Sequence, residues 1–371
     1  MNRLICNRCV MDNERDKTFR VDENGYCNYC IDTLKRLPSE YFPGPSGKKK
    51  LDAIMDRIKA DGVGKEYDCM VGISGGVDSS YVIYLGHKYG LRMLAVHIDD
   101  GLDTEIAVEN IDNICKRAKT DIIMVKPDLD QYKDILRSFF LARVPNLAMP
   151  QDNILIAALK DTANKYDLKY NLSGANFSLE CILERSTGVN VLDKKHILAI
   201  HKQFGKGSID KLHMTTFYEK YIHGRYFNKT INVLPLNFID YKLDDALKEL
   251  GDFSNYVYYG GKHYESILTR FLQCYYLPEK YGFDKRKSHF SSMIVTGQMS
   301  REEAMERIAK PAYISAELKE YDFSFLANYL SLSWQEFDSL IMQPAKNHHD
   351  YRMSQLNKVD WIARKFRKYL G

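Results

Sequence analysis

The sequence predicts an α/β protein in which a doubly wound parallel sheet follows a small cysteine-rich module and precedes a mostly helical region. Three observations favour this fold. From Asp68 onward, short apolar stretches alternate with amphipathic stretches of helical period, as in strands joined by helical crossovers. Four of the eight cysteines lie as two pairs near the start of the chain. After about residue 190 the sequence becomes Tyr-rich and helix-periodic.

The elements of the central domain follow from hydrophobic period and from glycine and proline positions. We expect strands at Cys69–Ile73, Arg92–Ile98, Ile122–Val125 and Tyr170–Ser173. We expect helices at Asp78–Tyr89, Glu105–Ala118, Gln131–Ala142 and Asn153–Tyr166, and packing helices at Asp322–Met342 and Lys358–Tyr369. In a doubly wound sheet, ligands bind where the C-terminal ends of strands open into loops.

These patterns divide the chain into four predicted parts. Residues 1–37 form the cysteine module, and 38–66 form a linker and a helix, because residues 38–50 are rich in Pro, Gly, Ser and Lys. Residues 67–190 form the α/β domain, and 191–371 form the helical C-terminal region.

Composition excludes little. With 371 residues, 45% hydrophobic and 27% charged, the chain can build a large core, and a net charge of +4 neither demands nor excludes a nucleic-acid partner. The N-terminus lacks the apolar run of a signal peptide, and no stretch approaches the roughly 18 uncharged residues of a membrane helix. We therefore expect a cytoplasmic protein without a membrane partner, whose cysteines are thiols or metal ligands.

The cysteine pairs predict a metal site. Cys6-x-x-Cys9 and Cys27-x-x-Cys30 can each form a knuckle, so that four thiolates meet tetrahedrally around one zinc ion. Because protein fills all four positions, this zinc is expected to be structural. A nucleic-acid-reading finger is the alternative, but five acidic residues interrupt the few basic ones there. The single cysteines are expected to fill core or helix positions rather than to catalyse; they are Cys69, Cys115, Cys181 and Cys274.

The turn after the first strand has the parts of a phosphate cradle. Two glycines allow backbone N–H groups to approach an anion, serines add hydroxyl donors, and the next helix presents its positive dipole end. Asp78 would sit too close to polyphosphate without a cation, so we expect it to bind Mg²⁺. The loop lacks the Gly-Lys-Ser/Thr ending of a Walker A motif. Its residues are Ser74, Gly75, Gly76, Val77, Asp78, Ser79 and Ser80.

This loop resembles the SGGxDS loop of PP-loop ATP pyrophosphatases, which include GMP, NAD and asparagine synthetases and tRNA-thiolating enzymes. The resemblance implies an adenine nucleotide alpha hydrolase-like domain that cleaves ATP between its α and β phosphates. Asp100 and Gly101 are similar to a DNG segment near the adenosine of GMP-synthetase-like members; a plain acidic turn is the alternative.

A second similar segment follows the fourth predicted strand. Residues 173–180 resemble the Gly-Thr-x-Asn-x-Ser-Glu stretch of NAD synthetase, whose glutamate helps to hold the metal. This implies nucleotide contacts by Gly174 and Asn176 and a Mg²⁺ contact by Glu180. Here Ala replaces Thr and the Asn spacing differs, so a surface glutamate is the alternative.

Cations gather in two C-terminal segments, 260–266 and 283–289. We expect Lys262, together with Lys285 or Arg286, to neutralise departing pyrophosphate, where charge accumulates during adenylyl transfer. Solvated helix ends are the competing interpretation. His263 and His289 could serve as acid–base groups or as structural hydrogen-bonding groups, and the sequence leaves both open.

Taken together, the cysteine module, VGISGGVDSSY, HIDDG, GANFSLE and the long block from GGKHYES to SREEA resemble one family along nearly the whole chain. It is the N-acetyl sugar amidotransferases of bacterial surface-polysaccharide pathways, including lipopolysaccharide O-antigen and pseudaminic acid synthesis. The resemblance implies an AMP-forming carbon–nitrogen ligase that converts an N-acetyl group to an acetamidino group with ATP and ammonia.

The resemblance also implies partners and a substrate. The chain shows no glutaminase domain, so ammonia is expected from a separate glutaminase subunit, with a cyclase-like channel subunit. The expected substrate is a nucleotide-linked diacetamido uronic acid or a nonulosonic acid. Basic residues that could contact its carboxylate are Lys194, Lys195, Arg225 and Arg270.

Two rival functions stay open at this stage. A tRNA thiolase would join the same loop to a cysteine-rich zinc module, but it usually needs further catalytic cysteines near the site, and the near-neutral charge makes nucleic acid an unexpected partner. A zinc-stabilised nucleotide-binding scaffold is the non-enzymatic rival, and the intact Ser74, Asp78 and Ser79 speak against it.

Overall fold

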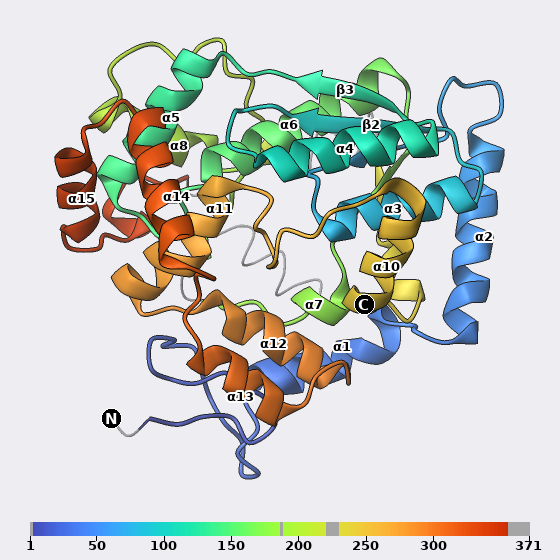
Figure 1. Cartoon of the computed structure of the whole chain (residues 1–371), viewed down its shortest axis with the longest axis horizontal. Helices are drawn as coiled ribbons and strands as arrows, with labels where there is room; N and C mark the ends of the chain where they lie inside the picture. The colour runs from blue at the N-terminus through green and yellow to red at the C-terminus, as the bar shows by residue number, and fades with distance from the viewer. Residues whose placement is uncertain (1–2, 186–187, 220–229, 355–371) are drawn as a thin grey trace. The chain divides into compact units, whose positions relative to one another are not determined.

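The computed structural model describes residues 3–185, 188–219 and 230–354 (Figure 1). The chain forms two compact units, each assembled from separate stretches. Unit 1 comprises residues 1–125, 162–186 and 230–323, and unit 2 comprises residues 126–161, 187–229 and 324–371. Within the described ranges, no helix is both long enough and apolar enough to cross a bilayer.

A five-stranded parallel sheet forms the centre of unit 1, which confirms the predicted fold class. Its strand order is β3-β2-β1-β4-β5, so β1 lies between β2 and β4. The fifth strand was not predicted. The strands are β1 (Cys69–Gly72), β2 (Met93–Ile98), β3 (Asp121–Val125), β4 (Tyr170–Leu172) and β5 (Ile231–Val233).

Helices of the central fold match their predicted positions closely, and the described residues after 190 are mostly helical, as predicted. In unit 1 they are α1 (Asn28–Glu40), α2 (Pro45–Asp61), α3 (Val77–Lys88), α4 (Glu105–Ala118), α7 (Phe177–Glu180), η2 (Pro235–Phe238), α10 (Leu243–Ser254), α11 (Ile267–Phe271), the π-helix η3 (Leu272–Tyr281), α12 (Lys285–Val295) and α13 (Arg301–Ala309). In unit 2 they are α5 (Leu129–Ala142), α8 (Lys194–Phe204), α15 (Trp334–Met342) and η4 (His348–Asp350); α6 (Met149–Lys165) and α14 (Ala316–Tyr329) run from one unit into the other.

The single helix predicted over Asp322–Met342 is wrong. The structure has two helices there, because Ser331 adopts a left-handed φ of 53° and Ser333 starts a new helix. The Ser333 side chain accepts from the Glu336 N–H, and the Glu336 carboxylate accepts from the Ser333 N–H, which is a capping box. The expected linker is also shorter than residues 38–50, since α1 continues to Glu40 and α2 begins at Pro45. The predicted helix Lys358–Tyr369 lies outside the described residues.

The core of unit 1 joins the sheet to the helices that carry the loops. Helices α3, α4 and α10 pack on one another, and α2 packs on η2. Buried apolar side chains from β1, β2, α3, α4 and α10 belong to one cluster. This packing fixes the loop between β1 and α3 against the rest of the unit.

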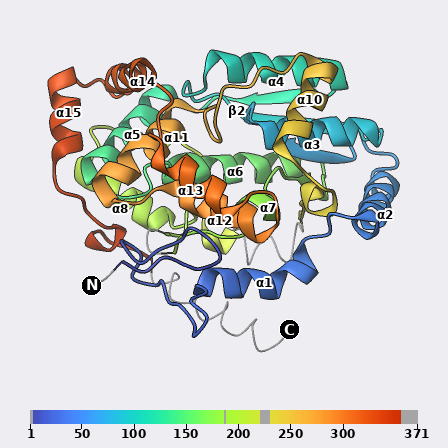
Figure 2. The ribbon, with the colours of Figure 1, turned by 60° about the horizontal axis from the view of Figure 1, so that its bottom comes forward.

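The N-terminal cysteine module packs on the helices α7, α12 and α13 (Figures 1 and 2). Lys287 on α12 forms ion pairs with Asp12 (2.7 Å) and Glu14 (3.9 Å), and the Arg301 guanidinium donates to the carbonyls of Cys6 and Cys9. The module therefore supports the helices that carry several predicted site residues.

Unit 2 is helical in its described parts. Helix α5 packs on α8, and Phe140 contacts Phe337 of α15 with ring centroids 5.8 Å apart. Two buried histidines, His196 and His348, form a hydrogen bond of 2.9 Å between ring nitrogens.

Candidate active site

The phosphate-cradle loop lies at the topological switch point of the sheet. The chain leaves β1 toward β2 on one side, while β4 lies on the other, so the loops after β1 and β4 meet at the same sheet edge. A Cβ added to Gly174 would come within 2.8 Å of the Ser79 nitrogen, so only glycine permits this close approach. The segment after β4 therefore lies directly against the start of α3.

The loop itself is a tight turn held by local hydrogen bonds. Gly75 has φ of 75°, and an added Cβ would meet the Ala107 carbonyl oxygen at 2.4 Å. The Ser74 N–H donates to the Ser79 hydroxyl (3.3 Å), and that hydroxyl donates to the Gly76 carbonyl (3.1 Å). Gly76 caps α3 with extended backbone geometry, which directs the helix N-terminus to the same place.

Asp78 is the centre of a polar cluster at this helix start. Lys262 contacts the Asp78 carboxylate at 2.9 Å and the Glu180 carboxylate at 3.2 Å. The Tyr241 hydroxyl donates to the other Asp78 oxygen at 2.5 Å. The structure thus brings together Asp78, Glu180 and Lys262. The sequence placed these three side chains at one site, although they come from three separate segments of the chain.

Two site lysines have different electrostatic environments. Burial lowers the pKa of Lys262, but the carboxylates of Asp78 and Glu180 outweigh it and raise that pKa above its ordinary value. Burial lowers the pKa of Lys285, and the more distant charges of Glu180 and Glu184 do not offset it. Lys262 is therefore a fixed cation, whereas Lys285 can lose its charge at a lower pH than an exposed lysine.

These groups line a cavity of about 550 Å³ within unit 1. Ten of the predicted site residues border it: Ser74, Gly76, Val77, Asp78, Ser79, Gly174, Glu180, Lys262, Lys285 and Arg286. Its wall also carries His263, Glu265, His289, Arg307 and Lys310. The cavity therefore combines the predicted phosphate-cradle loop with carboxylates and several cationic side chains.

Five other predicted nucleotide contacts in the described part of the chain do not border this cavity. The Asp100 carboxylate is buried and accepts from the Leu102 N–H (3.1 Å), and Gly101 has φ of 76°, so the segment forms a tight turn. The Asn176 side chain caps α7. Gly75 is a buried residue of the loop, and the buried Ser80 hydroxyl has no hydrogen-bond partner among the described residues. Their roles toward a nucleotide stay predictions.

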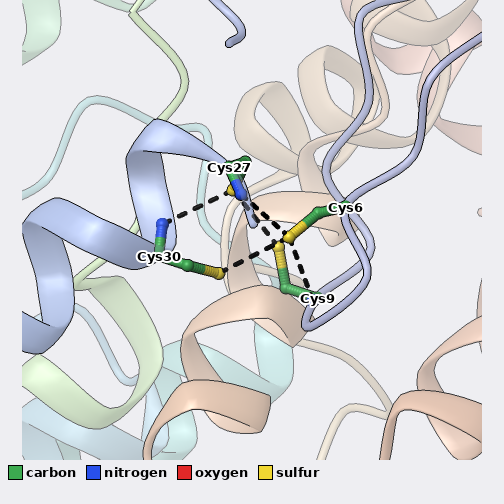
Figure 3. Close-up of side chains that lie close together, drawn as sticks. All are labelled: Cys6, Cys9, Cys27 and Cys30. Carbon is green, nitrogen blue, oxygen red and sulfur yellow. Dashed lines mark hydrogen bonds between the residues drawn. The ribbon is translucent and has the colours of Figure 1, made fainter. Parts of the chain in front are cut away.

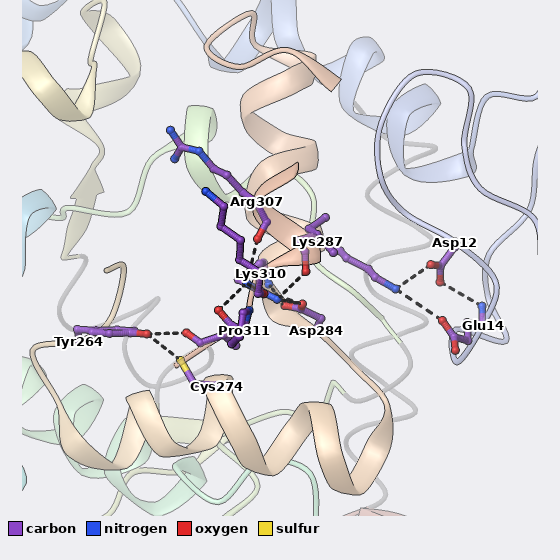
Figure 4. A network of polar contacts seen from close by, with 12 residues as sticks. Asp12, Glu14, Tyr264, Cys274, Asp284, Lys287, Arg307, Lys310 and Pro311 are labelled. Carbon is purple, nitrogen blue, oxygen red and sulfur yellow. Dashed lines mark hydrogen bonds and ion pairs between the residues drawn. The ribbon is translucent and has the colours of Figure 1, made fainter. Parts of the chain in front are cut away.

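Arg286 reaches the cavity, but its guanidinium is engaged elsewhere. It forms a bidentate pair with Asp284 (Nη2 to Oδ2, 2.7 Å; Nε to Oδ1, 3.0 Å). It also donates to the carbonyls of Arg307, Ile308 and Lys310 at the end of α13; Figure 4 shows Asp284, Arg307 and Lys310 of this network. These contacts support a positioning role, and its predicted role toward pyrophosphate has no contact in support.

The basic residues predicted for a substrate carboxylate are dispersed. Arg270 is buried in a bidentate pair with Asp322 (Nε to Oδ2, 2.8 Å) and does not border the cavity. Lys194 and Lys195 belong to unit 2, where the Lys194 ammonium donates to the Met214 carbonyl. Arg225 lies outside the described residues.

Sequence reasoning missed three groups beside the loop. Glu265 lies so close that a Cβ on Gly76 would be 3.0 Å from its Oε1. The Tyr259 hydroxyl accepts from the Val77 N–H (3.2 Å), and the Tyr256 hydroxyl donates to the Gly75 carbonyl (2.9 Å). The only available signal was the density of tyrosines around residues 256–264, which also fits a core.

The four N-terminal cysteines converge as predicted (Figure 3). All are buried, and their sulfurs lie within 4.8 Å of one another. The sulfur separations are 3.9 Å for Cys6 and Cys30 and 3.7 Å for Cys9 and Cys27. Tetrahedral zinc with Zn–S bonds of about 2.3 Å places sulfurs about 3.8 Å apart, so the geometry fits a zinc ion. Backbone N–H groups also point at these sulfurs, as expected for thiolates.

The single cysteines are poor candidates for thiolate chemistry. Cys69 and Cys115 are buried in the core of unit 1. Burial raises the pKa of Cys181 to about 11, and it likewise raises the pKa of Cys274, which borders the cavity, to about 11. At neutral pH these groups are thiols, which disfavours the thiolase alternative.

A family model and a curated relative match parts of this chain. A family model described as the C-terminal domain of LPS biosynthesis protein WbpG-like proteins matches residues 265–367. An uncharacterized protein of Methanocaldococcus jannaschii is 24% identical over 312 residues, which cover 83% of this chain and 94% of the relative.

Two solved structures resemble this chain at low sequence identity and low TM-score. NMN synthetase from Francisella tularensis has a TM-score of 0.29 and 14% identity, covering 56% of this chain and 92% of that one. An NH3-dependent NAD synthetase from Campylobacter jejuni has a TM-score of 0.29 and 18% identity, covering 56% and 93%. Likeness at this level does not establish a shared function.

Proposed function

We propose that this protein is an ATP-dependent, AMP-forming amidotransferase that converts an N-acetyl group of a sugar to an acetamidino group. The observation that carries this proposal is the cavity itself. It joins the Ser74–Ser79 loop to the Lys262 ammonium, which lies between the carboxylates of Asp78 and Glu180. The same wall continues into the segment that matches the LPS biosynthesis family model.

The chemistry has two steps. The amide oxygen attacks the α-phosphorus of ATP, an oxygen–phosphorus bond forms, and the bond to the β phosphate breaks as pyrophosphate leaves. Ammonia then adds to the activated carbon, a carbon–nitrogen bond forms, and AMP leaves with the carbon–oxygen bonding electrons. An amide carbon is a poor electrophile with a poor leaving group, and adenylation corrects both defects.

The chain's own residues divide these tasks. The loop N–H groups and the α3 N-terminus hold the phosphates, and Lys262 and Lys285 stabilise the charge that accumulates on departing pyrophosphate. Asp78 and Glu180 would hold Mg²⁺, because their oxygens already converge on one cation, Lys262. Bound Mg²⁺ would supply further neutralisation of phosphate charge. The four cysteines would hold a structural zinc.

The proposal extends to substrate and partners. The substrate class is a nucleotide-linked diacetamido uronic acid or a nonulosonic acid of bacterial surface glycans. Ammonia comes from a separate glutaminase subunit, with a cyclase-like subunit forming the channel. The supporting observations are the LPS biosynthesis description of the matched segment and the long C-terminal block.

The test uses purified protein with Mg-ATP, ammonium salt and a panel of diacetamido sugars, while AMP, pyrophosphate and sugar mass are followed together. We expect AMP and pyrophosphate in step with a sugar in which NH replaces one oxygen, and no product when glutamine replaces ammonium. Asp78→Asn should reduce the rate at least about 100-fold, the size expected for loss of a charged transition-state contact. Asp112→Asn, at an exposed ion pair with Lys116, is the matched control. ATP turnover without any change in the sugars would overturn the proposal.

A further inference from the structure

His289 on α12 is a buried polar side chain whose Nδ1 has no hydrogen-bond partner among the residues that the structure describes. The residue is only 7% exposed, and it borders the cavity one turn after Lys285. Among the described residues, no donor or acceptor reaches its Nδ1. Leaving a buried polar atom unpaired costs about 1–3 kcal/mol, so such an atom in a side chain that borders a cavity indicates a function.

The surroundings of His289 are polar and tightly packed. The His263 ring meets it edge to face, with centroids 5.6 Å apart, and His263 itself adopts a left-handed φ of 63°. The His263 Nδ1 lies 3.7 Å from Glu265 Oε1, while Glu265 Oε2 is buried without a partner in the described part of the chain. Two unpaired polar atoms therefore lie in one part of the wall.

The charged groups that face His289 keep its ring neutral. Burial lowers its pKa well below the ordinary value, and the positive charges of Lys262, His263 and Lys285 lower it further. The nearby carboxylates do not reverse this, because Asp78 and Glu180 contact Lys262, and Glu265 faces His263. A neutral imidazole in this position has a lone pair available at neutral pH.

A metal-binding role does not explain this arrangement. Among residues 3–185, 188–219 and 230–354, the cysteine cluster is the only group of three or more His, Cys, Asp or Glu side chains whose ligand atoms converge. His263 and His289 meet by ring packing at right angles rather than by directing nitrogens to a common point. What the ring offers is a base inside the cavity that contains the phosphate loop.

We propose that His289 is the base that accepts a proton from the attacking amine, a role that rests on the proposed amidotransferase function. As ammonia adds to the activated carbon, the new carbon–nitrogen bond leaves a positive charge on the attacking nitrogen. His289 takes one proton from that nitrogen, and the carbon–oxygen bond to AMP then breaks. AMP leaves with the carbon–oxygen bonding electrons while the lone pair on nitrogen forms the carbon–nitrogen double bond of an amidinium ion. His289 then passes its proton to water and is again neutral.

This role makes a prediction that a structural histidine does not. Without the base, the amine adduct collapses back, and water attacks the activated carbon instead, which returns the N-acetyl sugar while AMP has been made. We expect His289→Asn to lower the ratio of acetamidino product to AMP at least tenfold in the assay with Mg-ATP and ammonium chloride. His213→Asn is the matched control, because His213 is an exposed histidine of unit 2, paired with Asp161.

A second measurement keeps the assignment testable if the first variant folds poorly. His289→Ala leaves space for a small base, and added imidazole should restore the product-to-AMP ratio without raising the rate of AMP formation. An unchanged product-to-AMP ratio in His289→Asn would overturn the assignment of His289 as the base. So would an equal loss of AMP and product in His289→Ala that imidazole does not restore. Neither result would overturn the proposed amidotransferase function. Failure of the wild-type protein to form any acetamidino sugar would instead overturn the proposed function and this inference with it.

Discussion

Lys262 and Lys285 border the same cavity, yet their environments give them different pH behaviour. Lys262 is held between two carboxylates, which keep it charged. Lys285 has no ion pair within 4.0 Å in the described residues, and burial lowers its pKa. Because only the protonated form can stabilise pyrophosphate, the adenylation step should depend on the charge of Lys285.

A pH profile tests this dependence. The rate of sugar-dependent exchange of pyrophosphate into ATP, measured without ammonium, should fall as pH rises through the lowered pKa of Lys285. In Lys285→Arg the falling limb should move to higher pH, since arginine stays charged. Lys116→Arg, at an exposed site, should keep the wild-type profile. Identical alkaline limbs in wild type and Lys285→Arg would contradict the role of Lys285.

The sequence could predict residues with a distinctive chemistry and spacing, but not those that work through position alone. The loop residues and Lys262 were recognisable because glycine, serine and lysine clusters follow predicted strands or turns. Tyr241, which donates to Asp78, is a single tyrosine among 26, and no local pattern marks it. Glu265 likewise needs the fold to bring it against Gly76.

At the scale of elements, Arg286 joins the start of α12 to the end of α13. Its guanidinium pairs with Asp284 and donates to the carbonyls of Arg307, Ile308 and Lys310 at the C-terminal end of α13. Arg307 and Lys310 lie in the segment that this network fixes (Figure 4). The structure therefore favours Arg286 as a residue that positions the cavity wall.

Replacing Arg286 should separate positioning from catalysis. We expect Arg286→Lys to lower the free energy of unfolding by about 2–3 kcal/mol, because lysine cannot reproduce the bidentate and carbonyl contacts. The Michaelis constant for the sugar should rise more than the turnover number falls. Denaturant unfolding and steady-state kinetics measure both. A large fall in turnover with unchanged stability would instead support the catalytic role predicted from sequence.

The cysteine module supports α7 and α12 from outside the cavity. Its core includes Phe177 of α7, and Lys287 of α12 pairs with Asp12. Burial raises the pKa of Asp12, but the Lys287 ammonium outweighs it and lowers that pKa below its ordinary value. Loss of the metal should therefore disturb the cavity wall without removing any cavity residue.

Metal removal tests this connection. Purified protein should contain one equivalent of zinc, and Cys27→Ser should lose it and melt at a lower temperature, because metal binding contributes to folding. Cys115→Ala, a buried cysteine outside the cluster, should keep the zinc even where it costs stability. Atomic spectroscopy measures the zinc content of each variant, and a thermal scan measures its melting temperature. Full zinc occupancy in Cys27→Ser would show that the cluster is not the zinc site.

The elements themselves were largely predictable because their signals are local. Strand Met93–Ile98 is an apolar run interrupted only by His97, and helix Glu105–Ala118 begins after a capping threonine. The strand β5 was missed because only three residues pair, and its first two residues are exposed. The break between α14 and α15 depends on one left-handed serine, whose backbone state no sequence period reports.

At the scale of the whole molecule, a buried histidine pair links stability to pH. His348 accepts from the Asn146 N–H and donates to His196, whose other nitrogen donates to the Arg352 carbonyl. Burial lowers the pKa of His348 to about 3, and burial also lowers the pKa of His196. Both rings are therefore neutral in the folded chain, while in the unfolded chain they take up protons below about pH 6.5.

This linkage has a definite sign. Stability is fully present above about pH 6.5 and falls as pH is lowered toward about 3, by at most about 1.4 kcal/mol per pH unit for each histidine. Unfolding free energies measured between about pH 7 and pH 5 should show this loss. His348→Gln should reduce the slope, whereas the exposed His213→Gln should leave it unchanged. An unchanged slope in His348→Gln would rule out this histidine as its source.

The central claim is that the cavity activates a substrate oxygen by adenylation. The most direct measurement follows that oxygen: a diacetamido sugar carrying heavy oxygen in its acetyl carbonyl is turned over with Mg-ATP and ammonium, and the AMP, pyrophosphate and sugar are analysed by mass spectrometry. The account predicts that the heavy oxygen appears in AMP and that the sugar product contains none at the reacting position. Heavy oxygen retained in the sugar, or found in pyrophosphate, would contradict it.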